Sequence, residues 1–149
     1  MTVARDIMSS KVVTIESNVS ATEIAKIMDK NKVSSIIITK DQLPIGMVTE
    51  RDLVSKIVAQ NKKPSEVKTI DITTSPLVIV SPLTPTDEIV EKMIEKKIRR
   101  VVVMDSNQPL GIITVTDFVK HLHDMLVDSQ NYNKNLYEQL IEDWEHWMS

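Results

Sequence analysis

Two copies of a Thr-x-x-Asp pattern are the residues of this sequence most suited to chemistry. Thr49 precedes Asp52, Thr114 precedes Asp117, and an apolar helical pattern begins at each acid. At a helix start such a pair forms a capping box, and the helix dipole also favours the carboxylate. A carboxylate held at a fixed point can equally accept hydrogen bonds from a ligand. The residues alone leave both roles open.

Three of the four arginines, Arg51, Arg99 and Arg100, are candidates for a local anion site. A guanidinium binds phosphate through two parallel N–H donors and suits this task better than lysine. The alternative is that Arg99 and Arg100 form a solvated pair at a strand end. The first half of the chain has Ser34 and Ser35 at the corresponding positions, so two sites built on these residues would not bind identically.

Catalytic chemistry has little support in the sequence. His121, His123 and His146 lie at or after the last helix of the repeated part, and no acid–histidine pair recurs. With two glycines and no cysteine, the chain has no glycine-rich phosphate loop, disulfide or thiolate. We therefore predict a protein that is not an enzyme, with no catalytic residue and no metal site.

The elements that position these side chains occur twice. Gly46-Met-Val-Thr-Glu-Arg-Asp52 returns 65 positions later as Gly111-Ile-Ile-Thr-Val-Thr-Asp117, and the register continues upstream without a gap. Self-similarity at a fixed period indicates one structural unit built twice. The boundaries that we predict are unit one at 1–64, unit two at 65–126 and a helical tail at 127–149.

Each unit is predicted to run strand, helix, strand, strand, helix. Short β-branched runs indicate buried strands, and apolar stripes that begin at capping residues such as Ser20 and Glu23 indicate helices. In unit one these elements are expected at 12–15, 20–31, 34–39, 46–49 and 50–59. In unit two they are expected at 77–80, from 84 with Pro85 in the first turn, at 101–104, at 111–114 and from 117 to 126.

Composition limits the range of partners. Residues 124–149 hold six of the 21 acids and one of the 18 bases, so the remainder is close to neutral. Because neither part of the chain has the basic excess of nucleic-acid-binding surfaces, nucleic acid is not an expected partner. No apolar run approaches the ~20 residues of a membrane span. Without a signal-peptide pattern or cysteine, a cytoplasmic location and no membrane contact are expected.

The tail departs from the repeat. It concentrates aromatic residues and has an apolar stripe at helical spacing, formed by Leu136, Tyr137, Leu140, Ile141, Trp144, Trp147 and Met148, with Tyr132 before it. One interpretation is a helix that folds back onto its own domain. The other is an intermolecular contact, since Trp and Tyr are enriched at interface cores. We predict that the tail strengthens a homodimer.

A tandem β-α-β-β-α unit that ends in Gly-apolar-apolar-Thr-x-x-Asp resembles the CBS domain pair, or Bateman module. The resemblance covers residues 3–123 and excludes the tail. The segments that carry it are Asp6-Ile7-Met8-Ser9, Val33-Ser34-Ser35-Ile36-Ile37-Ile38, Gly46 to Asp52 and Ile98-Arg99-Arg100-Val101-Val102-Val103. It implies a stand-alone protein of α/β (α+β) class, whose units pack by their sheets around a pseudo-two-fold axis and leave two clefts.

The resemblance also implies ligands and site residues. Family members bind adenosyl compounds, including AMP, ADP, ATP and in some cases S-adenosylmethionine or NAD, and commonly pair into dimers. Each cleft draws on both units, and the carboxylate would accept from the ribose hydroxyls. One cleft would combine Thr114, Thr116 and Asp117 with Val12, Val13, Ser34 and Ser35. The other would combine Thr49, Arg51 and Asp52 with Leu77, Val78, Ile98 and Arg99, with Arg100 as a further phosphate ligand.

Two functional hypotheses follow. The first is a regulatory module that senses adenine nucleotides and acts through self-association or an unknown protein partner. The second is a structural adaptor with vestigial clefts that works through its aromatic C-terminal helix.

Overall fold

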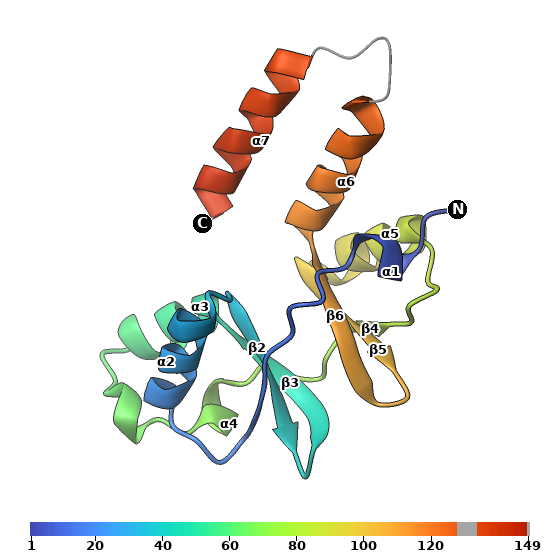
Figure 1. The fold of residues 1–149 in the computed structure, drawn as a ribbon. Coiled ribbons are helices and arrows are strands. Elements are labelled where there is room, and N and C mark those ends of the chain that lie inside the picture. The colour runs from blue at the N-terminus through green and yellow to red at the C-terminus, as the bar shows by residue number, and fades with distance from the viewer. Residues whose placement is uncertain (128–133, 149) are drawn as a thin grey trace.

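The computed structural model describes residues 1–127 and 134–148, and it contains two similar three-stranded sheets, each covered by helices (Figure 1). The first half contains α1 (Ala4–Ile7), β1 (Thr14–Glu16), α2 (Ala21–Asn31), β2 (Ser35–Lys40), β3 (Leu43–Thr49), α3 (Glu50–Leu53) and a π-helical turn η1 (Val54–Val58). The second half contains a 3₁₀ turn η2 (Pro64–Glu66), α4 (Thr69–Ile72), β4 (Ile79–Val80), α5 (Thr86–Lys96), β5 (Arg100–Asp105), β6 (Gln108–Thr114) and α6 (Val115–Val127). Helix α7 (Lys134–Met148) follows.

The two sheets have the same topology, which confirms the predicted tandem α+β architecture. β1 lies parallel to β2 and β4 parallel to β5, while β2–β3 and β5–β6 are antiparallel hairpins. Both hairpins carry a register shift at equivalent places, after Ile38 and after Val103. The β-branched runs explain the central strands, because Ile36 to Ile38 and Val101 to Val103 are almost completely buried.

Where the elements differ from the sequence-based expectation, the differences are local. β1 and β4 begin two residues later than expected, and Pro85 is the N-cap of α5 rather than part of its first turn. The helix expected over 50–59 is α-helical only to Leu53 and continues as the π-helical turn η1. Of the capping box predicted for Ser20 and Glu23, the structure has one contact: Ser20 Oγ accepts from the Glu23 amide at 3.4 Å.

The leading segment of each unit packs on the other unit. Ala4 of α1 belongs to the buried cluster of the second unit, with Ile89 and Ile113. Ile72 of α4 belongs to the cluster of the first unit, with Ile24. The boundary between residues 64 and 65 remains a prediction. In the structure, α1 comes before the first strand of unit one but completes the core of unit two, and α4 comes before the first strand of unit two but completes the core of unit one.

A third buried cluster lies where the two sheets meet. Equivalent residues of the two units form it in pairs: Ile37 with Val102, and Met47 with Ile112. Val12 and Leu77, another equivalent pair, pack against it. The two units therefore share an apolar contact, and its pairs of equivalent residues indicate an approximate two-fold relation between the units.

Both glycines lie where a crossing segment touches a hairpin. The 73–74 segment pairs with Met47, and the 8–9 segment pairs with Ile112. A Cβ atom on Gly46 would lie 2.6 Å from the Thr74 carbonyl oxygen, and one on Gly111 would lie 2.7 Å from the Ser9 carbonyl oxygen. Because backbone atoms cannot rotate away, neither position has room for a side chain.

Gly46→Ala is therefore expected to lower the free energy of unfolding by roughly 1–3 kcal/mol, as overpacking commonly does. Urea denaturation followed by circular dichroism measures this change in the free energy of unfolding. Ser65→Ala, on an exposed connection, is the control and should change stability by less than about 0.5 kcal/mol. Equal stability of the two variants would show that the crossing segment can move aside.

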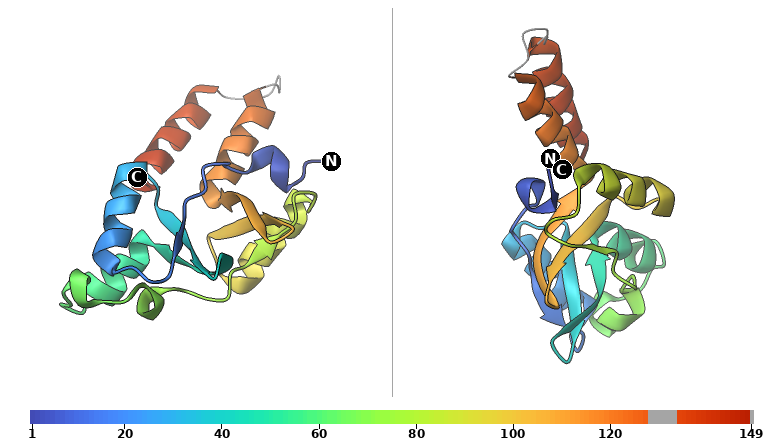
Figure 2. Two further views of the ribbon diagram at one scale, coloured as in Figure 1. Left: turned by 60° about the horizontal axis from the view of Figure 1, so that its bottom comes forward. Right: turned by 90° about the vertical axis from the view of Figure 1, so that its right-hand side faces the viewer.

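Helix α7 returns antiparallel beside α6 of the same chain (Figures 1 and 2). Lys120 Nζ of α6 lies 3.4 Å from Glu145 Oε1 of α7. Of the predicted stripe, Trp144 and Ile141 are half-buried and Leu140 is 55% exposed. Tyr132 and the side chains of Leu136, Tyr137, Trp147 and Met148 lie outside the described residues. The structure thus has the fold-back contact, and the tail-strengthened homodimer remains a prediction.

Candidate ligand site between the two units

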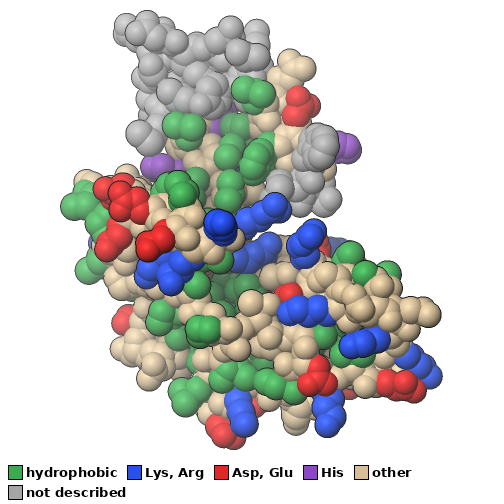
Figure 3. Space-filling model, turned by 180° about the vertical axis from the view of Figure 1, so that it is seen from behind, with side chains coloured by type: hydrophobic (Ala, Val, Ile, Leu, Met, Phe, Trp, Pro, Cys, Tyr) green, Lys and Arg blue, Asp and Glu red, His purple; other side chains and the backbone are tan. Residues whose placement is uncertain are grey.

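The structure brings one predicted group of site residues around a single cavity. The cavity has a volume of about 650 Å³ and lies between the units. Lys and Arg side chains gather around a hollow between the units in Figure 3. All eight residues expected on this side line it: Thr49, Arg51, Asp52, Leu77, Val78, Ile98, Arg99 and Arg100. The six lining residues that were not predicted are Met47, Ser55, Thr74, Pro76, Lys97 and Val102.

Asp52 is held at the start of α3 by the predicted capping box. Its Oδ2 accepts from the Thr49 amide at 2.8 Å and from Thr49 Oγ1 at 3.1 Å. In return, Thr49 Oγ1 accepts from the Asp52 amide at 3.3 Å. Asp52 is only 8% exposed, so the structural role considered for this residue is confirmed.

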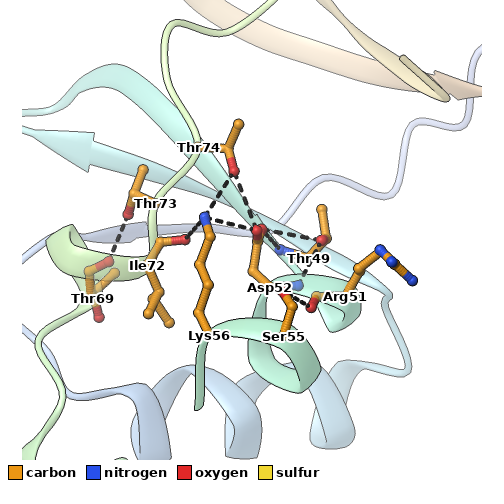
Figure 4. Close-up of polar contacts among 9 residues, drawn as sticks. All are labelled: Thr49, Arg51, Asp52, Ser55, Lys56, Thr69, Ile72, Thr73 and Thr74. Atoms are coloured by element: carbon orange, nitrogen blue, oxygen red, sulfur yellow. Dashed lines mark hydrogen bonds and ion pairs between the residues drawn. The ribbon is translucent and has the colours of Figure 1, made fainter. Parts of the chain in front are cut away.

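The other carboxylate oxygen of Asp52 has partners that the sequence did not reveal (Figure 4). Oδ1 lies 3.0 Å from Lys56 Nζ and accepts from Thr74 Oγ1 at 3.3 Å. Lys56 Nζ also donates to the Ile72 carbonyl at 3.1 Å. A carboxylate offers about four acceptor positions. A ribose hydroxyl that reached Asp52 would therefore have to replace Lys56 or Thr74.

The cationic side chains that line the cavity differ in their exposure to solvent and in their hydrogen bonds. Arg51, Arg99 and Lys97 are exposed. Arg100 is half-buried and donates to Ser34 Oγ at 3.2 Å. Burial lowers the pKa of Arg100, against the opposing effect of the nearby acids Glu50 and Asp52. Since arginine remains charged in proteins, Arg100 adds a fixed positive charge at the junction of the units.

Three of the unpredicted lining residues have polar side chains: Ser55, Thr74 and Lys97. Ser55 Oγ donates to the Arg51 carbonyl at 2.8 Å. Lys97 ends α5 in the left-handed conformation, with φ 54°. Its repeat equivalent, Lys32, ends α2 in the same way, with φ 55°. Because Lys32 and Lys97 are equivalent residues of the repeat, both at a helix end, the repeat was the sequence signal that could have indicated Lys97. Thr74 reaches the cavity because its segment crosses β3, which no local pattern indicated.

The second predicted group is placed differently. Asp117 Oδ2 accepts from the Thr114 amide at 2.7 Å, which places this carboxylate at the start of α6 as expected. Thr116 accepts from the Trp144 indole of α7 at 3.3 Å. The remaining members are distributed between the packed core and the surface: Val12 and Val13 pack against buried clusters, Ser35 is buried in β2, and Ser34 lines another cavity of about 590 Å³. In the described part of the chain, these contacts do not gather the group around one shared cavity.

A metal-binding cluster and a membrane-spanning helix are both absent from the described residues. Within 1–127 and 134–148 there is no cluster of three His, Cys, Asp or Glu side chains that could hold a metal ion. The same part of the chain contains no helix with the length and apolar character needed to cross a membrane. The predictions of no catalytic residue and no metal are not tested by these observations.

The sequence matches the family model of the CBS domain twice, over residues 4–59 and 67–124. Since the two matches cover most of the chain, this protein belongs to the CBS domain family. It contains two such domains in tandem, as the repeat predicted. CBS domain pairs are regulatory ligand-binding modules, and CBS domain proteins are generally regulatory rather than catalytic.

Two comparisons specify the relationship further. An uncharacterized protein of Methanopyrus kandleri is 37% identical over 124 residues, which is 81% of this chain and 63% of that relative. The chain also spans 63% of a second archaeal relative, from Methanocaldococcus jannaschii. Among solved structures, the CBS domain pair of protein MJ0100, in complex with 5′-methylthioadenosine and S-adenosyl-L-methionine, has a TM-score of 0.74 and 29% identity. That match covers 84% of this chain and 98% of the solved one.

A hexameric CBS-CP12 protein from bloom-forming cyanobacteria matches the complete chain, with a TM-score of 0.72. Its 23% identity supports the fold alone. Neither match tests the predicted homodimer or the assignment of individual side chains to a ligand.

Proposed function

We propose that this CBS pair senses an adenosine phosphate, bound in the cavity lined by Asp52, and acts through a partner or through self-association. The observation that carries the proposal is the charge of the cavity. Four cations line it, Arg51, Lys97, Arg99 and Arg100, against the single carboxylate of Asp52. That carboxylate is itself paired with Lys56. A site with this charge favours an anion, and arginine suits phosphate oxygens.

The rest of the cavity suits a purine ring. Apolar side chains from both units complete the lining: Met47, Leu77, Val78, Ile98 and Val102. Ligand sites commonly combine such apolar walls with a few polar groups that orient the ligand. That the CBS pair of MJ0100 was solved with two adenosine derivatives supports an adenosyl ligand here.

Charge also suggests an order of preference among adenosyl ligands. ATP and ADP carry more negative charge than AMP, whereas S-adenosylmethionine carries a sulfonium cation. Because nearby opposite charges attract and like charges repel, the four cations should favour ATP over AMP and disfavour S-adenosylmethionine. NAD, with a diphosphate, would lie between these extremes.

The experiment is a thermal unfolding series with ATP, ADP, AMP, adenosine and S-adenosylmethionine. A ligand at 100 times its Kd adds about 2.7 kcal/mol of stability. For a chain of this size we expect an upward shift in Tm of about 5–10 °C with ATP. Absence of a shift with every ligand, at millimolar concentration, would favour the adaptor hypothesis. A larger shift with S-adenosylmethionine than with ATP would contradict the charge argument.

We further propose that the protein is cytoplasmic, that it has no catalytic activity and that it forms homodimers. Light scattering over a dilution series, with and without ATP, measures self-association and its dependence on the ligand.

A further inference from the structure

The carboxylate of Asp52 has a donor at each of the roughly four acceptor positions that such a group offers. Its Oδ2 accepts from the Thr49 amide and from Thr49 Oγ1. Its Oδ1 accepts from Thr74 Oγ1 at 3.3 Å and lies 3.0 Å from Lys56 Nζ. A ribose hydroxyl therefore binds this carboxylate only in exchange for one of these donors.

The donors from Thr49 and Thr74 are fixed by the backbone. The two bonds from Thr49 belong to the capping box that begins α3, so breaking them would deprive the helix of its cap. Thr74 is paired with Met47 through two backbone hydrogen bonds, each 2.9 Å long. Neither residue can move away from Asp52 without disturbing a helix start or a paired segment.

Lys56 is the donor that is released at the lowest cost. Its side chain is 39% exposed, so water can solvate the ammonium when it leaves Asp52. Lys56 Nζ also donates to the Ile72 carbonyl at 3.1 Å and to Thr74 Oγ1 at 3.3 Å. A lysine ammonium has three donors on a flexible stem, so it retains other acceptors when one is lost.

Lys56 and its acceptor face different cavities. Asp52 and Thr74 line the cavity proposed for the nucleotide, the inner cavity. Lys56 lines a second cavity of about 820 Å³ between η1, η2 and α4, the outer cavity, together with the acids Glu66 and Asp71. In Figure 4, Lys56 extends from η1 toward Asp52 and Thr74. The ion pair therefore spans the boundary between the cavities, and the outer side offers Lys56 further carboxylates.

The second unit differs at these positions. His121 stands where the first unit has Lys56, and Ser9 stands where it has Thr74. The described side-chain bonds of Asp117 come from its own capping box. Lys56 lies in the π-helical turn η1, whereas α6 continues as an α-helix past His121. The lysine contact is thus a feature of the unit whose carboxylate lines the inner cavity.

We propose that Lys56 regulates the nucleotide site by competing with the ribose for Asp52, and that ligand binding transfers its ammonium to the outer cavity. This inference rests on the proposed function, which places the nucleotide beside Asp52. Lys56 is a positioning residue, because it acts on the ligand through the carboxylate. The apparent affinity decreases with the fraction of molecules in which Asp52 is available. Occupancy of the inner cavity then changes the charge on the surface formed by η1, η2 and α4.

Lysine labelling of the unaltered full chain measures the transfer. With limiting acetic anhydride and mass spectrometry, addition of ATP should increase the acetylation of Lys56 severalfold, because its ammonium loses a buried partner. Acetylation of Lys97 should decrease, because this residue lines the inner cavity. Lys40, exposed at the end of β2, is the control and should not change.

The two lysines separate the two proposals. Protection of Lys97 by ATP without increased labelling of Lys56 would overturn the competition and leave the proposed function intact. No change at either lysine, together with an unchanged Tm, would contradict the proposed function itself.

Substitution of Lys56 tests the competition in the opposite direction. If Lys56 holds Asp52 in about nine of ten molecules, Lys56→Met should lower the Kd for adenosine about tenfold in calorimetry. Adenosine is the probe because loss of a cation also weakens the attraction of a polyphosphate. Lys56→Arg retains a cation and should bind adenosine as the wild type does.

Lys62→Met is the matched control. It makes the same change at an exposed residue of the outer cavity and should leave the Kd for adenosine unaltered. A purely structural role of Lys56 predicts the opposite sign, since loss of a support weakens a site. Unchanged or weaker binding of adenosine by Lys56→Met would therefore overturn the proposal.

Discussion

Replacing Asp52 with alanine is expected to lower the free energy of unfolding by about 2–3 kcal/mol. Loss of an N-terminal cap costs roughly 0.5–2 kcal/mol. The change also leaves Lys56 and Thr74 without their shared acceptor, and an unsatisfied polar group in a buried site costs a further 1–3 kcal/mol. Since Lys56 is 39% exposed and keeps the Ile72 carbonyl, the second contribution should lie toward the lower end.

The repeat provides the control for this prediction. Asp117→Ala removes the equivalent capping carboxylate, whose described hydrogen bonds both come from Thr114. Its cost should stay within the roughly 0.5–2 kcal/mol of a cap. Urea denaturation of the two single variants measures the difference. If both lose the same stability, the Lys56–Thr74 network contributes nothing measurable.

Removing Arg51 and Arg99 together should weaken ATP binding by about 1.5–3 kcal/mol, a roughly 10- to 150-fold rise in Kd. Both side chains line the cavity and are exposed, so they are free to meet phosphate oxygens. Arg100 is left in place because it is half-buried and bonded to Ser34, so its loss would also perturb the junction of the units. Adenosine, which lacks phosphate, should bind this variant as it binds the wild type.

Arg5→Ala is the matched control. Arg5 is the fourth arginine of the chain, and its exposed side chain belongs to α1, away from the residues that line the cavity. This change should leave ATP affinity unaltered. Calorimetry with ATP and adenosine compares the three proteins. A double variant that lost ATP and adenosine affinity equally would place the two arginines outside the phosphate site.

Local patterns predicted the elements of the fold well. Runs of β-branched residues located β2 and β5. The segments that begin at Gly46 and Gly111 were correctly predicted as strands, although β3 and β6 begin three residues earlier than expected. Thr49 has the full capping box that its position indicated, and Ser20 has one of its two expected contacts. These features depend on hydrogen bonds and side-chain directions within a few residues, so they can be recognised from sequence. The internal repeat, which has no gaps, also predicted that the chain forms two equivalent units.

The candidate site was partly predictable for a related reason. The repeat and the family resemblance placed eight residues around one cavity, and the structure brings all eight together. Lys56, Thr74 and Lys97 were missed, for different reasons. Thr74 reaches Asp52 through the packing of a segment distant in sequence, which leaves no local signal. Lys56 is only four residues after Asp52, and Lys97 has the repeat equivalent Lys32 at the end of α2, so both had signals in the sequence. Conversely, the repeat suggested two clefts with different binding properties, while the structure places α7 against Thr116 at the start of α6.

The sequence by itself determined that two equivalent units exist, which strands each contains, and where a carboxylate begins a helix. All of these follow from short-range periodicity and capping. The structure determined that α1 and α4 complete the opposite cores, that Thr74 reaches Asp52, and that Trp144 reaches Thr116. The physical reason is that such contacts depend on which surfaces fit when distant segments pack, and this fit leaves no periodic signal along the chain.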